Sequence, residues 1–363
     1  MKNICFSIEG ISGCGGTERV TLQIANALVD KYNINILSIE KKREELFFPA
    51  DNRIKFDYLY SKRIDNHLKR YFFSIIIGIR KYLKKNNIDI LIVVDVTQLI
   101  MVYWATLGLD IKIISWEQFN CLRSEGSLIH RAARKIAAKY TNAIITLTDE
   151  DKKAYVDYFK PRANVMRIYN PITFPNVDVK KDELKENIIL SIGRLSYQKG
   201  YDLLLDVANL LFNTYQVRNW KWIIVGEGDE RKKIEDKISD YNLVNKVILV
   251  GEKENVSEYL NNSKIFVLTS RYEGFGLVIA EAQQFGLPVI SFDCKMGPAE
   301  LVENGKNGYL VPCFDIENMA KKIRELITDD NKRNKLAIQA GSALDRFEYQ
   351  KIVDEWNKLI NKL

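Results

Sequence analysis

The chain has 363 residues, enough for two domains that each bury a core of their own. Its 47% hydrophobic and 28% charged residues exclude a largely disordered protein. The net charge of +7 indicates an anionic ligand or partner and leaves nucleotide diphosphates, nucleic acids and anionic lipids as alternatives.

The cysteines and the apolar runs indicate the cellular compartment of the protein. Five scattered cysteines without a Cys-x-x-Cys pair predict neither a disulfide framework nor a zinc site, and they favour a reducing cytosol. We expect no signal peptide, because the N-terminus leads directly into a strand. The longest apolar run, from Tyr71 to Ile79, is shorter than the ~20 residues of a spanning helix. The chain is therefore not expected to cross a membrane.

A glycine-rich turn follows the first predicted strand, residues 4–8, and precedes a helix predicted from Thr17 to about Tyr32. Such a turn presents backbone N–H groups and the positive end of the helix dipole to a phosphate. A nicotinamide-binding fold would use this turn, with Glu40 after the second strand, but its fingerprint requires glycine where Glu18 stands. A nicotinamide-dependent oxidoreductase is thus a disfavoured alternative.

Two basic segments follow. Residues 62–85 combine lysines and arginines with an apolar run. This pattern fits a helix that lies on an anionic membrane, and it equally fits an ordinary helix whose apolar side packs into the core. A second basic patch favours membrane contact slightly, and it consists of His130, Arg131, Arg134, Lys135 and Lys139. We interpret the only histidines, His67 and His130, as surface residues.

Polar residues then follow two predicted strands of the first half. The strand at 111–115 leads into Trp116 to Asn120. The triplet Asp149-Glu150-Asp151 follows Thr148 at a predicted helix start, where the dipole favours acidic residues. We interpret the triplet as helix capping, and the sequence requires no metal.

The second half repeats the alternation of strands and helices. Asn170-Pro171, Pro175 and the charged run 180–186 predict a domain boundary, with domains at residues 1–172 and 173–345. A strand at 188–192 precedes a glycine-bounded turn that contains Arg194 and Lys199. These two cations either clamp a diphosphate or lie solvated on the surface.

Two glutamates lie in a predicted strand–helix–strand unit further along the chain. A strand at 265–269, a turn with Glu273, a helix with Glu281 and a strand at 289–292 form a parallel unit. Ligands of doubly wound sheets bind beyond the carboxyl ends of such strands. Two carboxylates there suit a polyhydroxylated ligand, whereas solvent-facing acids are the simpler alternative.

These motifs together resemble the retaining glycosyltransferases of family 4. The resemblance rests on Gly15-Gly16-Thr17-Glu18-Arg19, on Gly193-Arg194-Leu195 with Lys199-Gly200, and on Glu273 and Glu281 with seven residues between them, followed by Gly286-Leu287-Pro288. It implies the α/β fold called GT-B, in which two Rossmann-like, doubly wound domains face a central cleft. It also implies a C-terminal helix, residues 346–363, that returns to the first domain.

The resemblance also implies roles for individual residues. Arg194 and Lys199 would bind the diphosphate, Glu273 the transferred sugar and Glu281 the ribose, so that Glu273, Arg194 and Lys199 are the expected catalytic residues. Further donor contacts are expected from Gly15, Gly16, Glu252, Lys253, Gly274, Phe275, Gly276 and Leu277. Acceptor contacts are expected from Glu117, Gln118 and Asn120. Many relatives carry histidine where Gln118 stands, and glutamine cannot shuttle a proton.

The implied activity is transfer, with retention, of a hexose or N-acetylhexosamine from a nucleotide diphosphate sugar. Gly297-Pro298 favours a UDP-sugar by the same resemblance, with a glycan or lipid-linked glycan as acceptor in bacterial surface polysaccharide biosynthesis. We expect neither a cofactor beyond the donor nor a metal, and a cytoplasmic protein that contacts the inner membrane face through Lys62 to Lys85. A non-enzymatic binder of nucleic acid or anionic surfaces is the third alternative. We expect no nucleic-acid partner, because the aromatic residues near Tyr71 are bunched in one apolar run.

Overall fold

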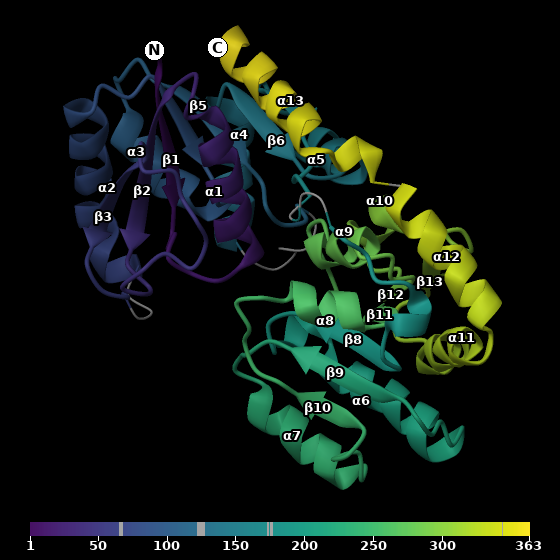
Figure 1. Ribbon diagram of the computed structural model, residues 1–363. Helices are drawn as coiled ribbons and strands as arrows, with labels where there is room; N and C mark the ends of the chain where they lie inside the picture. The colour runs from purple at the N-terminus through teal and green to yellow at the C-terminus, as the bar shows by residue number, and fades with distance from the viewer. Residues whose placement is uncertain (65–67, 122–127, 173, 175–176, 343) are drawn as a thin grey trace. The chain divides into compact units, whose positions relative to one another are not determined.

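The computed structural model describes residues 1–64, 68–121, 128–172, 174, 177–342 and 344–363 (Figure 1). The chain forms two compact units. Unit 1 combines Met1–Pro171 with Tyr349–Leu363, and unit 2 is Ile172–Glu348. The expectations for His67 and for the boundary residue Pro175 lie outside the described residues.

Unit 1 contains a parallel sheet of seven strands in the order β3-β2-β1-β4-β5-β6-β7. The central strands are continuous apolar runs, because helices cover both faces of a parallel sheet. The strands are β1 (Asn3–Ile8), β2 (Asn33–Glu40), β3 (Lys55–Tyr60), β4 (Ile90–Val93), β5 (Lys112–Trp116), β6 (Ala143–Thr146) and β7 (Asn164–Arg167). The order reverses between β1 and β4, so the loops after these strands diverge at that point.

The helices of unit 1 are α1 (Gly16–Leu28), α2 (Leu68–Lys85), α3 (Leu99–Thr106), α4 (Leu128–Tyr140), α5 (Asp149–Phe159) and α13 (Tyr349–Lys362), with a 3-10 turn η1 (Val96–Gln98). Helix α3 packs between α2 and α4, and α13 packs against α1. The ring of Trp356 on α13 lies 4.8 Å from that of Trp116 at the end of β5. The last helix of the chain is thus part of the first domain's core.

Unit 2 contains a parallel sheet of six strands in the order β10-β9-β8-β11-β12-β13. The strands are β8 (Ile188–Ile192), β9 (Lys221–Val225), β10 (Val247–Leu249), β11 (Ile265–Leu268), β12 (Val289–Phe292) and β13 (Gly308–Val311). Here the order reverses between β8 and β11, the two strands that precede the predicted diphosphate and glutamate motifs.

The helices of unit 2 are α6 (Tyr201–Asn209), α7 (Arg231–Asp240), α8 (Ser257–Asn262), α9 (Leu277–Gln284), α10 (Pro298–Leu301), α11 (Ile316–Thr328) and α12 (Asp330–Ser342). Short turns are η2 (Asp182–Leu184), η3 (Tyr197–Lys199), η4 (Leu210–Thr214) and η5 (Asp345–Phe347). Helix α6 is followed directly by the π turn η4. The prediction of two parallel, Rossmann-like α/β domains is confirmed. Within the described residues, no helix is both long and apolar enough to span a bilayer.

Candidate active site

The candidate site of unit 2 lies where loops leave the carboxyl ends of neighbouring strands. The backbones of these loops touch, because two glycines permit it. A Cβ on Gly200 would lie 2.2 Å from the carbonyl oxygen of Thr269, and one on Gly226 would lie 2.0 Å from that of Gly193. Both glycines also have positive φ, +64° and +146°. Any other side chain would force these loops apart.

Lys199 and Glu273 meet at this point. Lys199 Nζ donates to Glu273 Oε1 at 2.7 Å, and the hydroxyl of Ser270 donates to the same oxygen at 2.6 Å. The Lys199 side chain is 16% exposed and that of Glu273 is 6% exposed, so the pair lies at the base of the loops and keeps contact with solvent. The structure therefore joins two residues that the sequence placed in separate motifs.

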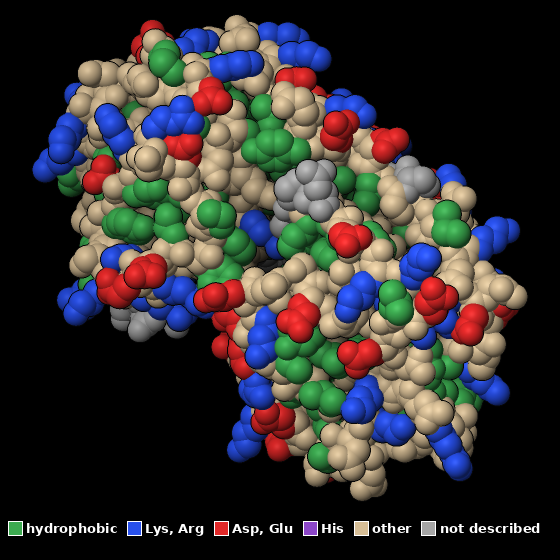
Figure 2. All heavy atoms as spheres, in the orientation of Figure 1, with side chains coloured by type: hydrophobic (Ala, Val, Ile, Leu, Met, Phe, Trp, Pro, Cys, Tyr) green, Lys and Arg blue, Asp and Glu red, His purple; other side chains and the backbone are tan. Residues whose placement is uncertain are grey.

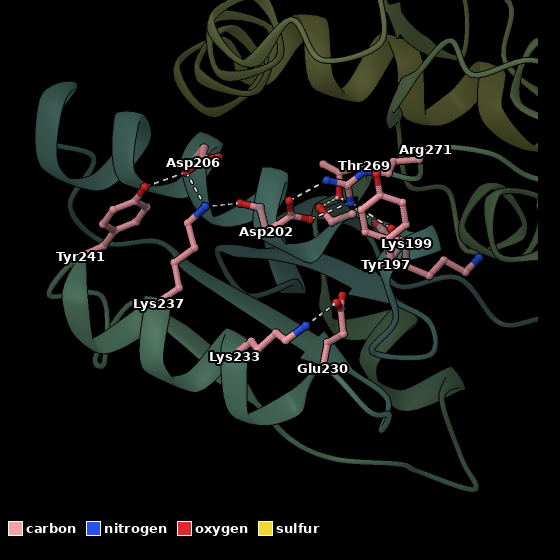
Figure 3. A network of polar contacts seen from close by, with 11 residues as sticks. Tyr197, Lys199, Asp202, Asp206, Glu230, Lys233, Lys237, Tyr241, Thr269 and Arg271 are labelled. Atoms are coloured by element: carbon pink, nitrogen blue, oxygen red, sulfur yellow. Dashed lines mark hydrogen bonds and ion pairs between the residues drawn. The ribbon is translucent and has the colours of Figure 1, made fainter.

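Arg271 fixes the two loops that carry this pair (Figure 3). Its guanidinium forms a two-pronged ion pair with Asp202 at 2.7 and 2.6 Å, and it donates to the carbonyl of Tyr197 at 2.9 Å. It also stacks 4.0 Å over the Tyr197 ring. The hydroxyl of Thr269 donates to the carbonyl of Lys199 at 3.2 Å. A bidentate, stacked arginine is a rigid support for the turn with Lys199.

The same network continues to α7. Figure 3 shows Lys237 between Asp206 and the backbone of Asp202, and the distances are 2.7 and 2.8 Å. Tyr241 donates to Asp206 at 2.7 Å. The start of α6 is thereby held by α7 as well as by Arg271. Sequence analysis missed this support, although Arg271 stands two positions before Glu273.

The remaining predicted donor residues of β8 and β11 take different positions. Arg194 is exposed directly after β8. Glu281 is only 1% exposed in the middle of α9. Gly276, at φ +87°, starts α9 before Leu277, while Gly274 is half-buried. Phe275 is buried, with its ring 5.5 Å from that of Phe347, so its side chain serves the core.

Glu252 and Lys253 follow β10, the edge strand that lies two strands from β8. Glu252 is half-buried and Lys253 is exposed. The carbonyl of Gly251 accepts from the backbone N–H of Gly226 at 2.9 Å, which ties this loop to the one after β9. The loop thus borders the glycine contacts without taking part in the Lys199–Glu273 pair.

In unit 1, Gly15 and Gly16 are exposed at the N-terminus of α1. A Cβ on Gly15 would lie 2.6 Å from Oε2 of Glu18, whose carboxylate lies over the turn. Lys42 forms an ion pair with Glu18 at 3.6 Å. Glu18 is therefore part of the turn itself, at the position where a nicotinamide-binding turn has glycine.

The expected acceptor residue Glu117 is held in a buried ion pair. Arg134 donates through Nε to Oε2 at 2.8 Å and through Nη2 to Oε1 at 3.3 Å. The Glu117 side chain is 0% exposed and that of Arg134 is 1% exposed. Arg134 also donates to the carbonyl of Cys121 at 2.9 Å. Arg134 is thus not part of a surface basic patch, which corrects the sequence interpretation, and no surface of Glu117 faces solvent.

Asp151 lies beside this pair. Its Oδ1 accepts from the backbone N–H of Cys121 at 2.8 Å, while its own N–H donates to Thr148, the cap of α5. Burial, followed by the nearby charge of Glu117, raises the pKa of Asp151 to about 7. The capping role of this segment is confirmed, but Asp151 is a buried group and not a solvated first-turn acid.

Gln118 and Asn120 are held by this framework. Both side chains are less than a tenth exposed. Gln118 Nε2 is buried without a hydrogen-bond partner among the described residues. A buried amide that lacks a partner is costly, so this nitrogen is available to a bound hydroxyl or phosphate oxygen. Among the residues that the structure describes, no group of acids, cysteines or histidines is arranged to hold a metal ion.

Comparison with known proteins places this geometry in a family. Residues 14–174 match the family model "Glycosyltransferase Family 4", and residues 175–342 match "Glycosyl transferases group 1". A Haemophilus influenzae protein described as an uncharacterized glycosyltransferase is 32% identical over 361 residues, covering 99% of this chain and 100% of that protein.

A second relative comes from Campylobacter jejuni. The GalNAc-α-(1→4)-GalNAc-α-(1→3)-diNAcBac-PP-undecaprenol α-1,4-N-acetyl-D-galactosaminyltransferase is 30% identical over 369 residues, which cover 99% of this chain and 98% of that enzyme. This relative, like the first, matches across both units of the chain.

Solved structures share the fold. Staphylococcus aureus TarM, a mutant with fondaparinux, α-GlcNAc-glycerol and UDP, has a TM-score of 0.84 at 18% identity and covers 99% of this chain and 100% of TarM. Anabaena HepE with UDP and glucose has a TM-score of 0.80 at 20% identity and covers 99% of both chains. The matches across both units argue against the oxidoreductase alternative. The chain belongs to glycosyltransferase family 4 and is a glycosyltransferase with the GT-B fold.

Proposed function

We propose that this glycosyltransferase moves a hexose or N-acetylhexosamine from a UDP-sugar to a hydroxyl of a glycan or lipid-linked glycan, with retention at the anomeric carbon. The observation that carries the proposal is the pairing of Lys199 with Glu273 at glycine-lined strand ends. Backbone that lies bare at these ends can approach a diphosphate closely. The complexes of TarM and HepE with UDP support the choice of donor.

Lys199 and Arg194 would bind the diphosphate. When the bond between the anomeric carbon and the diphosphate breaks, the leaving group takes the electron pair and its negative charge grows. Cations fixed at that position stabilise the transition state more than the ground state. These two side chains supply positive charge without a metal ion.

Glu273 and Glu281 would bind the polyhydroxylated parts of the donor. Glu273, at the base of the loops, would accept from hydroxyls of the transferred sugar, and Glu281 from the ribose. Because Lys199 and Ser270 both contact Oε1 of Glu273, Oε2 is the oxygen placed to accept from the sugar. Glu252, Lys253, Gly274, Gly276 and Leu277 would complete the donor site of unit 2 through loop and backbone contacts. In unit 1, the exposed turn with Gly15 and Gly16 would offer backbone N–H groups to a phosphate.

On the acceptor side, Gln118 and Asn120 would contact the incoming hydroxyl. The buried Arg134–Glu117 pair assigns Glu117 a different task, which is to hold this loop in place. An amide at residue 118 can orient the acceptor hydroxyl by hydrogen bonding and cannot take its proton.

The names of the relatives support the acceptor class. The Campylobacter relative acts on an undecaprenol-linked glycan, and an Erwinia amylovora relative is an amylovoran biosynthesis glycosyltransferase. We therefore place this chain in bacterial surface polysaccharide biosynthesis. A lipid-linked acceptor implies work at the inner face of the cell membrane, with peripheral contact through Lys62 to Lys85.

Calorimetric binding of UDP, GDP, ADP and NAD in metal-free buffer tests the proposal. We expect UDP to bind, and Glu281→Gln to weaken this binding about tenfold or more while thermal unfolding changes little. Glu317→Gln is the matched control, because Glu317 is a solvent-exposed acid of α11 in the same unit. Binding of NAD in place of UDP, or equal UDP affinity of Glu281→Gln and the natural chain, would refute the assigned donor site.

A further inference from the structure

The outer surface of α2, α3 and α4 differs from the rest of the described surface. Seven of the eighteen large hydrophobic side chains that are exposed among the described residues lie on these helices or directly after α3. The most exposed are Leu128 (82%), Phe73 (77%), Ile129 (56%), Ile77 (54%) and Trp104 (53%). Single exposed hydrophobic residues are ordinary, but a group on adjacent helices indicates a binding surface.

Helix α2 has two apolar faces. Ile75 and Ile79 are fully buried against the sheet, whereas Phe73 and Ile77 point outward from the same helix. An ordinary surface helix has one apolar stripe and a polar outer face. The core therefore accounts for the inner stripe of α2 and leaves the outer stripe without a structural role.

The three helices form one continuous layer, because α3 packs against α2 on one side and against α4 on the other. The ring of Tyr103 on α3 lies 4.6 Å from that of Tyr140 on α4, and Trp104 lies next to Tyr103 at a ring distance of 5.3 Å. The exposed residues of the three helices therefore lie on the outer side of this one layer, with Trp104 near the C-terminal end of α4.

The charges of this surface have a single sign. The chain contains 47 aspartates and glutamates, and not one of them is in α2, α3 or α4. Exposed cations frame the apolar residues: Lys81, Lys84 and Lys85 on α2, and Arg131, Lys135 and Lys139 on α4. Figure 2 shows Lys and Arg side chains along the margin of unit 1 where Figure 1 places α2.

We infer that the outer surface of α2, α3 and α4 docks on an anionic phospholipid bilayer, with Phe73, Ile77, Trp104, Leu128 and Ile129 inserted at the headgroup level. Cations next to exposed aromatic and aliphatic side chains are the combination that interfacial binding requires. The inference rests on the proposed function and extends it, since it adds α3 and α4 to the basic segment and names the anchors.

Other occupants fit less well. A second copy of the chain would bring two like-charged surfaces together, which opposes association. A nucleic acid would use the cations, but Ile77, Leu128 and Ile129 offer no stacking surface for bases. Both remain outcomes of the test below.

Sedimentation of the full chain with vesicles tests this surface. We expect binding to vesicles of phosphatidylcholine and phosphatidylglycerol in equal parts, and weak binding to pure phosphatidylcholine. Removing three cations, with Lys81→Gln, Lys84→Gln and Lys85→Gln, is expected to weaken binding at low salt on the order of 100-fold, since each lysine contributes roughly fivefold. Three exposed lysines of unit 2, Lys232, Lys321 and Lys335, changed to Gln provide the matched control.

A second measurement reports insertion. Tryptophan emission is expected to shift to shorter wavelength on anionic vesicles, and Trp104→Phe should remove most of this shift. Equal binding to both vesicle types, equal binding of the two triple variants, or a chain that forms dimers or prefers DNA through this surface would overturn the inference. UDP binding, measured on the same variants without vesicles, is expected to be unchanged, so failure here leaves the donor site untouched.

Discussion

Each unit contains an ion pair between a basic and an acidic residue near its strand ends, and the two pairs differ in their exposure to solvent. In unit 2, Lys199 and Glu273 pair at the base of loops whose backbones touch, and both keep contact with solvent. In unit 1, Glu117 and Arg134 pair in the interior with no exposed surface on the carboxylate. The first pair is accessible to a ligand and the second holds a loop. The same two charge types therefore serve binding in one sheet and architecture in the other.

The largest expected effect comes from breaking the interior pair. Arg134→Met leaves a buried carboxylate uncompensated, and we expect the free energy of unfolding to fall by about 3–5 kcal/mol. Urea denaturation measures this loss, and Arg131→Met, on the exposed side of the same helix, should change stability by less than about 0.5 kcal/mol. The double variant Glu117→Gln, Arg134→Met should recover most of the lost stability, because it no longer contains the buried carboxylate. Similar losses for Arg131→Met and Arg134→Met would contradict a structural role of the buried ion pair.

Asp151, which lies beside the interior pair of unit 1, should make the stability of the chain depend on pH. Because its pKa is raised from 3.8 to about 7 in the folded chain, the native state holds a proton that the unfolded state loses. Stability from this group is present below about pH 4 and is lost as the pH rises to about 7, by up to about 1.4 kcal/mol per pH unit. Asp151→Asn should remove that slope and gain up to about 4 kcal/mol over the natural chain at pH 8.

Denaturation of the Asp151→Asn variant and the natural chain at pH 5, 6, 7 and 8 measures this difference. The amide can still accept from the N–H of Cys121, so the loop is retained. Glu150→Gln, an exposed neighbour, is the control and should follow the natural chain at every pH. A stability difference that is constant with pH would show that Asp151 is ionised in the folded protein.

In unit 2 the accessible pair should affect rate more than stability. Lys199→Met is expected to lower kcat, measured as the formation of UDP during sugar transfer, by about 10²–10³-fold. The substitution removes a cation that stabilises the leaving diphosphate. The melting temperature should fall less than in Arg134→Met, because the Lys199 side chain is 16% exposed and Ser270 still donates to the Glu273 carboxylate. Lys232→Met is the control on the exposed side of α7. Full activity of Lys199→Met would remove Lys199 from the proposed mechanism.

The smallest expected effect concerns the support of that pair. Asp202→Asn weakens the two-pronged contact with Arg271, and we expect about a tenfold loss in kcat/KM, which corresponds to about 1.4 kcal/mol. Asp236→Asn, which changes an exposed acid of α7 in the same unit, is the matched control. If both variants lose activity equally, Arg271 does not position Lys199 specifically.

The sequence predicts the parts of this protein that are local in the chain. Strands 188–192 and 289–292 have the predicted bounds, because continuous apolar runs between turn residues define buried strands without help from the rest of the fold. The family is likewise identified from short motifs, such as Glu273 and Glu281 around Gly-Phe-Gly, in which each residue lies within a few positions of the next.

Contacts between distant positions could not be predicted in this way. Arg271 meets Asp202 across 69 positions, and Arg134 meets Glu117 across 17. On a helix rich in exposed cations, nothing in the composition distinguishes the buried Arg134 from its neighbours. Its place inside the unit depends on how α4 packs against the loop after β5, which only the folded chain defines.

The packing of α13 bears on how the molecule is made. Unit 2 is continuous in sequence, whereas unit 1 takes its last helix from the opposite end of the chain, and Trp356 packs on Trp116 in its core. During synthesis, all of unit 2 therefore leaves the ribosome before unit 1 receives that helix. Unit 1 begins before unit 2 and is completed after it, so its nascent core must wait for α13 with part of its apolar surface uncovered.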